Sequence, residues 1–287
     1  MWRNPRTSNS MKHIFWGLII LALVPWGLEA QLGLGPRAES EVELFIEEGQ
    51  ARPGDTVHAG VLMTLPFGRH TYWKNPGDVP ADTEISWTLP KGCTVGEISW
   101  PIPQKYFSRI LYSYVYEGQV LLMIPIHLGK DLATGPHKIR ATIEWTECAR
   151  LKCFQGKASI SANVVVGEKK TPGKEAKLFE KWRKLTPEHN KPLELPAWWV
   201  RVKGKRSVQF RVPVASKETE VYFFPMEPAR ANYAVEPATV RENGEAHATL
   251  TKKVRVRKGK EPTTITGVLV RDGQGWNTTL KLGKAPR

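Results

Sequence analysis

The sequence has 287 residues, enough for two domains of ordinary size, each with its own hydrophobic core. Hydrophobic residues make up 41% and charged residues 24%, a composition that excludes a disordered chain and a protein that lies mostly in a membrane. The formal net charge of +14 is unevenly placed, because residues 168–287 hold 26 basic and 13 acidic residues. We interpret this excess as a solvated surface, with a basic binding patch as the alternative.

Residues 1–30 have the features of a secretory signal peptide. Three basic residues precede an apolar run over residues 14–24, and Ala30 ends a suitable cleavage site. An uncleaved anchor is the alternative, because residues 14–30 are at the lower limit for a membrane-spanning helix. No later stretch is apolar enough to cross a bilayer, so we expect a protein with no transmembrane span after signal cleavage. Export also argues against nucleic acid as a partner.

Residues 31–167 are predicted to form a first domain built of short strands. Apolar and polar residues alternate along these strands, and segments rich in proline and glycine separate them. No helical period interrupts the pattern, which therefore favours an antiparallel β-sandwich. The predicted strands cover residues 41–46, 56–65, 84–89, 109–116, 120–127, 138–145 and 158–166.

Residues 168–197 are predicted to be a linker that contains a short helix. Apolar residues recur at i, i+4 and i+7 from Leu178 to Leu185 within a charged segment, which is typical of a helix with one buried stripe. Pro187 ends this helix. The strand pattern resumes after the linker, so residues 198–287 are predicted to form a second, smaller β-sandwich domain.

Cys148 and Cys153 are spaced to form a disulfide. If the strands that flank them form a hairpin with a four-residue loop, the two cysteines lie directly opposite each other, at a distance that suits the bond. Two interpretations stay open. A disulfide that closes about six residues contributes only about 2 kcal/mol by loop closure, so structural need is weak. Arg150 and Lys152 beside the sulfurs favour a thiolate, which argues for a redox-active bond.

Other chemistries leave few signs in the sequence. Cys93 stands alone and is expected to be a buried free thiol. Motifs of thioredoxin folds, serine hydrolases and zinc proteases are absent, so we predict no cofactor and no metal. Copper bound by Cys148, Cys153 and a neighbouring methionine or histidine is the one alternative to that prediction.

Four segments precede the paired cysteines in a fixed order: residues 70–78 (HTYWKNPGD), 87–92 (WTLPKG), 97–103 (EISWPIP) and 114–120 (YVYEGQV). Together they resemble the N-terminal periplasmic domain of the thiol:disulfide interchange protein DsbD and of its relative ScsB. Residues 175–285 resemble, more weakly, the second β domain of ScsB-type proteins. The resemblance implies an all-β protein with two immunoglobulin-like antiparallel β-sandwich domains joined by a short helical linker.

The resemblance also implies a function, thiol:disulfide interchange in the periplasm. Cys148 and Cys153 would be the exchanging pair. Which of the two attacks stays open at this point, and we favour Cys153. Because this sequence contains no membrane electron conduit, the electron donor would be a separate transmembrane protein of the DsbD type. The electron acceptors would be periplasmic thioredoxin-like or disulfide proteins. A non-catalytic, immunoglobulin-like binding module of the cell envelope, with a structural disulfide, remains the alternative.

The resemblance further assigns four tyrosines to the neighbourhood of the sulfurs. The segment that contains Tyr112, Tyr114 and Tyr116 resembles the loop that caps the cysteine pair and shields it from stray oxidants. Tyr72 is expected near the sulfurs.

Overall fold

A computed structural model gives the structure of the protein. The predicted signal peptide lies outside the residues that it describes, and among those residues no helix combines the length and the apolar character that a bilayer crossing requires. The described residues are 37–108, 111–150, 152–214, 220–226, 233–243, 247–256 and 261–285.

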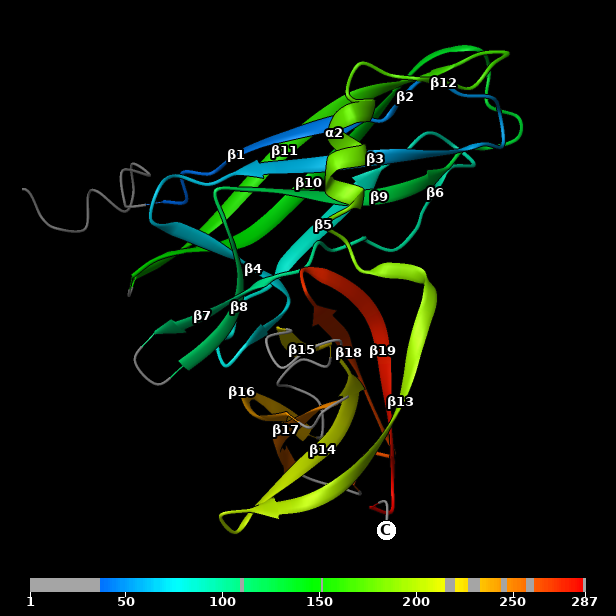
Figure 1. The fold of residues 1–287 in the computed structure, drawn as a ribbon. Helices are drawn as coiled ribbons and strands as arrows, with labels where there is room; N and C mark the ends of the chain where they lie inside the picture. Colours follow the sequence, from blue (N-terminus) through cyan, green and yellow to red (C-terminus); the bar gives the residue numbers. More distant parts are fainter. Residues whose placement is uncertain are drawn as a thin grey trace, which may run out of the picture. The chain divides into compact units, whose positions relative to one another are not determined.

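The first half of the described chain is a sandwich of two antiparallel sheets (Figure 1). One sheet has the strand order β1 (Glu41–Ile46), β3 (Thr56–Thr64), β9 (Gln119–His127) and β6 (Thr94–Val95). The other has the order β11 (Lys152–Val166), β10 (Gly135–Ala149), β4 (Arg69–Gly77), β8 (Leu111–Glu117) and β7 (Gln104–Ser108), and β5 (Thr83–Thr88) pairs with β10. The short strands β2 (Glu48–Gln50) and β12 (Thr171–Pro172) form a separate pair.

Side-chain alternation explains which face of each strand is buried. Along β10, Ile139, Ile143 and Trp145 point into the core between the sheets, while Arg140 and Glu144 are exposed. Such alternation is typical of a sheet with one face in the core and one face in water. The sheet that contains β10 therefore has an outer face open to solvent over much of its length.

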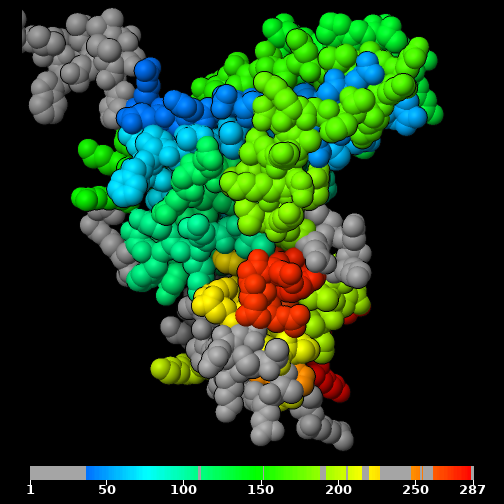
Figure 2. All heavy atoms as spheres, turned by 45° about the horizontal axis from the view of Figure 1, so that its top comes forward, coloured from blue at the N-terminus to red at the C-terminus, as the bar shows by residue number. Residues whose placement is uncertain are grey.

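The central strands β3 and β9 of the other sheet are buried on both faces because a helix covers their outer side. Strand β9 is buried almost continuously, and helix α2 (Ala176–Arg183) lies across β3 and β9 in Figure 1. Phe179 and Trp182 of the helix are buried against the sheet. Gly60 permits this approach, since a Cβ atom there would lie 2.7 Å from Cζ of Phe179. Figure 2 shows the other side of the helix exposed on the surface.

The second half of the described chain is one curled sheet of seven strands. Its order is β15 (Val221–Pro225), β18 (Thr264–Arg271), β19 (Gln274–Gly283), β13 (Glu188–Val202), β14 (Lys205–Pro213), β17 (His247–Val256) and β16 (Tyr233–Asn243). Neighbouring strands are antiparallel except β13 and β19, which run parallel. The sheet has its own apolar core, in which Phe210 contacts Phe223 edge-to-face at 5.3 Å.

The all-β, immunoglobulin-like fold class predicted from the sequence is confirmed. The predicted helix is present as α2, and β13 begins at Glu188, before residue 198 where the strand pattern was expected to resume. In the first half, strands β2, β4, β6 and β7 were not predicted. The domain boundaries at residues 167 and 197 stay predictions.

Candidate functional site

The hairpin of β10 and β11 places the two cysteines opposite each other. Cys148 pairs with Cys153 in the ladder, their Cα atoms are 4.0 Å apart, and a disulfide joins them. The loop is shorter than the four residues expected, because the ladder continues one step further and pairs Ala149 with Lys152. Arg150 at the start of this tight turn has φ 50°. This left-handed backbone conformation is adopted most often by glycine, asparagine and aspartate.

The two sulfurs are in different surroundings. Cys153 is exposed, whereas Cys148 is 1% exposed. Cys148 belongs to a small apolar cluster of its own, which also contains Tyr72, Ala81 and Val115. A thiolate from another protein can therefore reach the disulfide at Cys153, and Cys148 is the sulfur that the protein shields.

Strand β4 brings two polar aromatic side chains to the buried sulfur. At its end β10 changes partner from β5 to β4, so that Cys148 lies opposite His70. The hydroxyl of Tyr72 donates a hydrogen bond to Sγ of Cys148 at 3.0 Å. Nε2 of His70 lies 3.2 Å from the same hydroxyl oxygen. Since residues i and i+2 of a strand share a face, His70 and Tyr72 form one polar chain that ends at the sulfur.

Burial shifts the pKa values of both groups in this chain. His70 and Tyr72 are 3% and 4% exposed. Burial lowers the pKa of His70, so its imidazole is neutral at neutral pH. Burial, together with the neighbouring Tyr106, raises the pKa of Tyr72 to about 12, so its hydroxyl keeps its proton. Both side chains can therefore donate or relay hydrogen bonds to the sulfur without adding a charge.

The predicted site tyrosines lie in different places. Tyr72 contacts the buried sulfur, and Tyr112 stacks against Phe107 with ring centroids 4.5 Å apart. Tyr114 and Tyr116 are in the main core of the sandwich, where the hydroxyl of Tyr116 donates to the carbonyl oxygen of Pro101 at 2.6 Å. The segment expected to be a capping loop is strand β8, and the capping role of its tyrosines stays a prediction.

Two residues that the sequence did not assign to the site are next to it. Tyr106 of β7 stacks on the His70 ring with centroids 4.5 Å apart and packs against the apolar cluster around Cys148. His70 begins the first of the four segments that carry the family resemblance, but no role at the site was predicted for it. The available signal was the two-residue spacing of His70 and Tyr72, which places both on one face only if residues 69–77 form a strand.

A buried ion pair supports the hairpin on its other face. The side chain of Glu147, next to Cys148, is fully buried and accepts a hydrogen bond from Nη1 of Arg69 at 2.6 Å. It also accepts hydrogen bonds from the backbone N–H groups of Glu39 and Ser40 and from the Ser40 hydroxyl. Burial alone would raise the pKa of Glu147, but these hydrogen bonds outweigh it and hold the pKa below its ordinary value.

Both predicted electropositive neighbours are exposed. Arg150 and Lys152 stand on either side of the turn, and neither side chain is buried against the sulfurs. Arg69 provides a further positive charge, and its guanidinium lies 5.1 Å from the centre of the Phe154 ring on β11. The positive setting that the sequence indicated is therefore present at the tip of the hairpin, on the solvent side.

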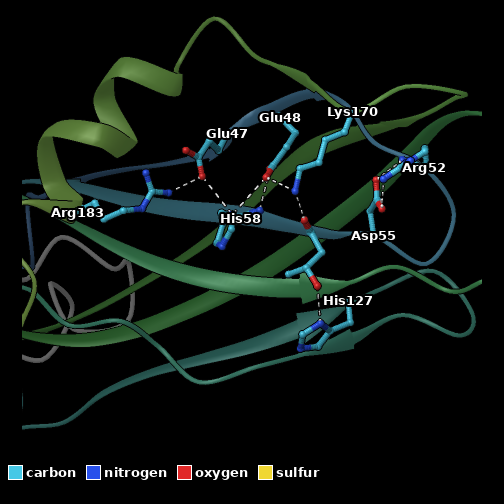
Figure 3. Close-up of polar contacts among 9 residues, drawn as sticks. Glu47, Glu48, Arg52, Asp55, His58, His127, Lys170 and Arg183 are labelled. Carbon is cyan, nitrogen blue, oxygen red and sulfur yellow. Dashed lines mark hydrogen bonds and ion pairs between the residues drawn. The ribbon is translucent and has the colours of Figure 1, made fainter. Parts of the chain in front are cut away.

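A second polar cluster has the residue types of a metal site but a different construction. Glu47, Glu48 and His58 offer ligand atoms that all lie within 4.8 Å of one another. Figure 3 shows that Arg183 and Lys170 approach the two carboxylates from opposite sides of His58. The N–O distance is 2.7 Å from Arg183 to Glu47 and 3.3 Å from Lys170 to Glu48. Each carboxylate therefore already has a cationic partner, and no metal ion is needed to balance the charge.

This cluster fastens the segment after the sandwich to the sheet. Lys170 also donates to the carbonyl oxygen of Thr56 at 2.7 Å, and Arg183 belongs to helix α2. Burial would raise the pKa of Glu48, but hydrogen bonds from His58 and the charges of His58 and Lys170 lower it overall. We interpret the cluster as structural.

Comparison with known proteins finds a family match within the first half of the chain. Residues 43–164 match the family described as thiol:disulfide interchange protein DsbD, N-terminal. The solved N-terminal periplasmic domain of ScsB from Proteus mirabilis is 15% identical with a TM-score of 0.63, over 86% of this chain and 94% of that one. The reduced N-terminal domain of DsbD from Neisseria meningitidis is 12% identical with a TM-score of 0.26, over 46% of this chain and 90% of that one. A search of curated proteins finds no match.

Proposed function

We propose that this protein passes electrons through Cys148 and Cys153 in the periplasm, a proposal supported by the match of residues 43–164 to the family of DsbD N-terminal domains. The donor in this proposal is a separate transmembrane protein, and the acceptors are periplasmic thioredoxin-like or disulfide proteins. In this proposal the predicted signal peptide directs export and is then cleaved. Thiol:disulfide interchange would then be its enzymatic activity.

The observation that carries the proposal is the difference in exposure between the two sulfurs. Exchange requires a sulfur that a partner thiolate can attack in line with the disulfide bond. Cys153 is exposed at the tip of a hairpin, and Cys148 is buried behind it. This arrangement supports Cys153 as the sulfur that forms the mixed disulfide and Cys148 as the sulfur that leaves and later resolves it.

The exposed cations agree with this assignment. Arg150 and Lys152 flank the turn and would stabilise a thiolate on Cys153 through solvent-screened attraction. Phe67, between β3 and β4, and Phe107, in β7, are exposed apolar side chains of the same sandwich. Exposed aromatic groups are common where partner proteins bind.

A matched pair of single-cysteine variants tests the proposal. In a Cys93→Ala background, Cys148→Ala leaves the exposed thiol and should trap partner proteins as mixed disulfides in cells. Cys153→Ala leaves the buried thiol and should trap few or none. Equal capture by both variants would contradict the assigned roles of the two sulfurs.

A glutathione titration of the protein with both cysteines tests whether the bond is reversible. A reduction potential below about −300 mV would mark an inert structural bond. That result, together with no capture by either variant, would favour the alternative of a non-catalytic binding module.

A further inference from the structure

We propose that Tyr72 is a catalytic residue of the exchange and that His70 positions it. In this proposal a two-link hydrogen-bond chain from His70 through Tyr72 stabilises the thiolate that forms on Cys148 when the disulfide opens. The proposal rests on the proposed function, and it adds to that function the identity of the group that receives the developing charge.

The protons available on these groups fix the donor and the acceptor in each hydrogen bond of the chain from His70 through Tyr72 to Cys148. A disulfide sulfur has no proton, so Sγ of Cys148 can only accept, and Tyr72 must donate across the 3.0 Å contact. A hydroxyl has a single proton, and that proton is then used. The 3.2 Å contact between Nε2 of His70 and the Tyr72 oxygen is a hydrogen bond only if Nε2 donates. His70 is therefore assigned the neutral tautomer with its proton on Nε2.

The surroundings keep both donors in the required state. Burial lowers the pKa of His70 and raises that of Tyr72, so the imidazole stays neutral and the phenol stays protonated at neutral pH. Tyr106 stacks on the His70 ring and limits its rotation. The chain is thus preorganised, and its hydrogen bonds strengthen as negative charge appears on the sulfur, because hydrogen bonds to ionised acceptors are the stronger ones.

Each exchange step breaks one sulfur–sulfur bond and forms another. A thiolate of a reduced dithiol protein attacks Sγ of Cys153, and a bond between that thiolate and Cys153 forms while the Cys148–Cys153 bond breaks. The bonding electron pair remains on Cys148 as a thiolate, which Tyr72 stabilises. The second thiolate of the partner then displaces Cys153. The partner is oxidised to a disulfide by two electrons, the cysteine pair is reduced, and the protons that the partner loses balance those that the product thiols take up from solvent.

Other charged and titratable groups act on the same sulfurs and must be kept constant. They lie on the strands next to the pair and in the hairpin turn: Arg69 on β4, Tyr106 on β7, Glu117 opposite His70 on β8, Glu147 on β10, Arg150 in the turn after β10, and Lys152 on β11. Variants that alter only Tyr72 or His70 leave this set unchanged. A difference between such variants therefore reports the hydrogen-bond chain.

The first experiment measures the pKa of the Cys148 thiol without any exchange partner. In the background Cys93→Ala with Cys153→Ala, thiolate absorbance is followed against pH, below the range in which tyrosines ionise. Tyr72→Phe, which removes only the hydroxyl, should raise the Cys148 pKa by about one unit, a tenfold loss of thiolate at a given pH. Tyr222→Phe, the same change in the second sheet, should leave it unaltered.

Two substitutions at His70 separate positioning from structure. His70→Phe keeps a ring for Tyr106 to stack on but removes the donor, and it should raise the Cys148 pKa part of the way. His70→Gln restores an N–H donor in place of Nε2 and should return the pKa toward the wild-type value. A purely structural role for His70 would give no rescue by glutamine.

The same variants with both cysteines present test the chain in exchange. Because a stabilised thiolate favours the reduced form where Cys148 is ionised, Tyr72→Phe should shift the equilibrium with glutathione about tenfold toward the disulfide at a pH above the Cys148 pKa of both proteins, a potential about 30 mV lower. An unchanged Cys148 pKa in folded Tyr72→Phe would overturn the chain even if exchange persists. If the wild-type protein shows no exchange, the proposed function is wrong, whereas the effect of Tyr72 on the Cys148 pKa is not affected.

One measurement needs no substitution. Nitrogen chemical shifts of the His70 ring in the wild-type protein distinguish its two neutral tautomers. A proton on Nε2 supports the chain, and a proton on Nδ1 overturns it. Because these chemical shifts are measured on the wild-type protein, they test the proposal even if a variant fails to fold.

Discussion

Replacing Glu147 by glutamine should destabilise the first sandwich much more than the same change at Glu144, three residues earlier on β10. The Glu147 side chain is fully buried, and the charge on its carboxylate is compensated by Arg69 at 2.6 Å. The Glu144 side chain is 55% exposed and pairs with Lys157, which is 67% exposed. The two positions share a strand and a substitution but differ in burial.

The magnitude follows from what glutamine would leave behind. An amide has one acceptor oxygen, and its NH₂ group would meet the backbone N–H groups of Glu39 and Ser40, which also donate. A hydrogen bond to a charged group contributes about 1.5–3 kcal/mol, and breaking a buried ion pair costs about 3–5 kcal/mol. Arg69 is 16% exposed and keeps Glu39 as a partner at 2.7 Å, so its charge is not stranded. We therefore expect a loss of about 2–4 kcal/mol for Glu147→Gln.

The assay is urea unfolding followed by tryptophan fluorescence at several pH values. For Glu144→Gln the loss should stay within about 1 kcal/mol, as for other exposed ion pairs. The pKa of Glu147 is lowered in the fold, so its contribution is present at neutral pH and is lost as pH falls through the folded pKa, below the ordinary carboxyl range. The difference in the free energy of unfolding between wild type and Glu147→Gln should therefore become smaller as the pH is lowered. Equal losses at both positions, or a gap that does not change with pH, would refute this reasoning.

Three further changes test other parts of the structure by the same unfolding assay. Gly156→Ala should cost about 1–3 kcal/mol through overpacking, because a Cβ atom would lie 2.2 Å from Cε2 of Trp145; a neutral result would mean that the indole moves aside freely. Phe179→Ala should cost about 3–5 kcal/mol, since its ring is fully buried under helix α2; a loss below about 1 kcal/mol would show that the helix does not stabilise the sandwich. Reducing the Cys148–Cys153 bond, with a sequence separation of 5, should cost only about 2 kcal/mol, and a loss of about 5 kcal/mol or more would identify a structural staple.

The strands that position the cysteines could be predicted because local information is sufficient there. Along β10 and β11 the alternation of apolar and polar residues is regular, and it places Cys148 opposite Cys153 for a short loop. The exposure of one sulfur and the burial of the other could not be predicted in this way. It depends on β4 and β8, which pack around Cys148 from elsewhere in the sequence.

Strand β4 was missed because its residues signal a turn. Asn75, Pro76 and Gly77 are strong strand breakers in sequence. The structure accommodates them with an irregular register between Tyr72 and Gly77, where Gly77 has φ 87° and a Cβ atom would lie 2.5 Å from the carbonyl oxygen of Tyr112. Without this strand, the shared face of His70 and Tyr72 is not visible in the sequence.

The tyrosines of β8 illustrate a different limit. The two-residue period places Tyr112, Tyr114 and Tyr116 on one face of the strand and Val115 on the other. The pattern does not say which face turns toward the cysteines. In the structure it is Val115 that belongs to the cluster around Cys148, while Tyr114 and Tyr116 fill the main core.

Helix α2 has a practical consequence for dissecting the protein. A fragment that ends at residue 167 would lose Phe179 and Trp182, and it would uncover the apolar outer side of β3 and β9. It would also lose the hydrogen bond from the N–H group of Ile102 to the carbonyl oxygen of Leu185. Such a fragment would expose an apolar surface that favours aggregation. Aggregation of a truncated sample should therefore not be attributed to the cysteine hairpin. A cut placed after Leu185 keeps this cover in place.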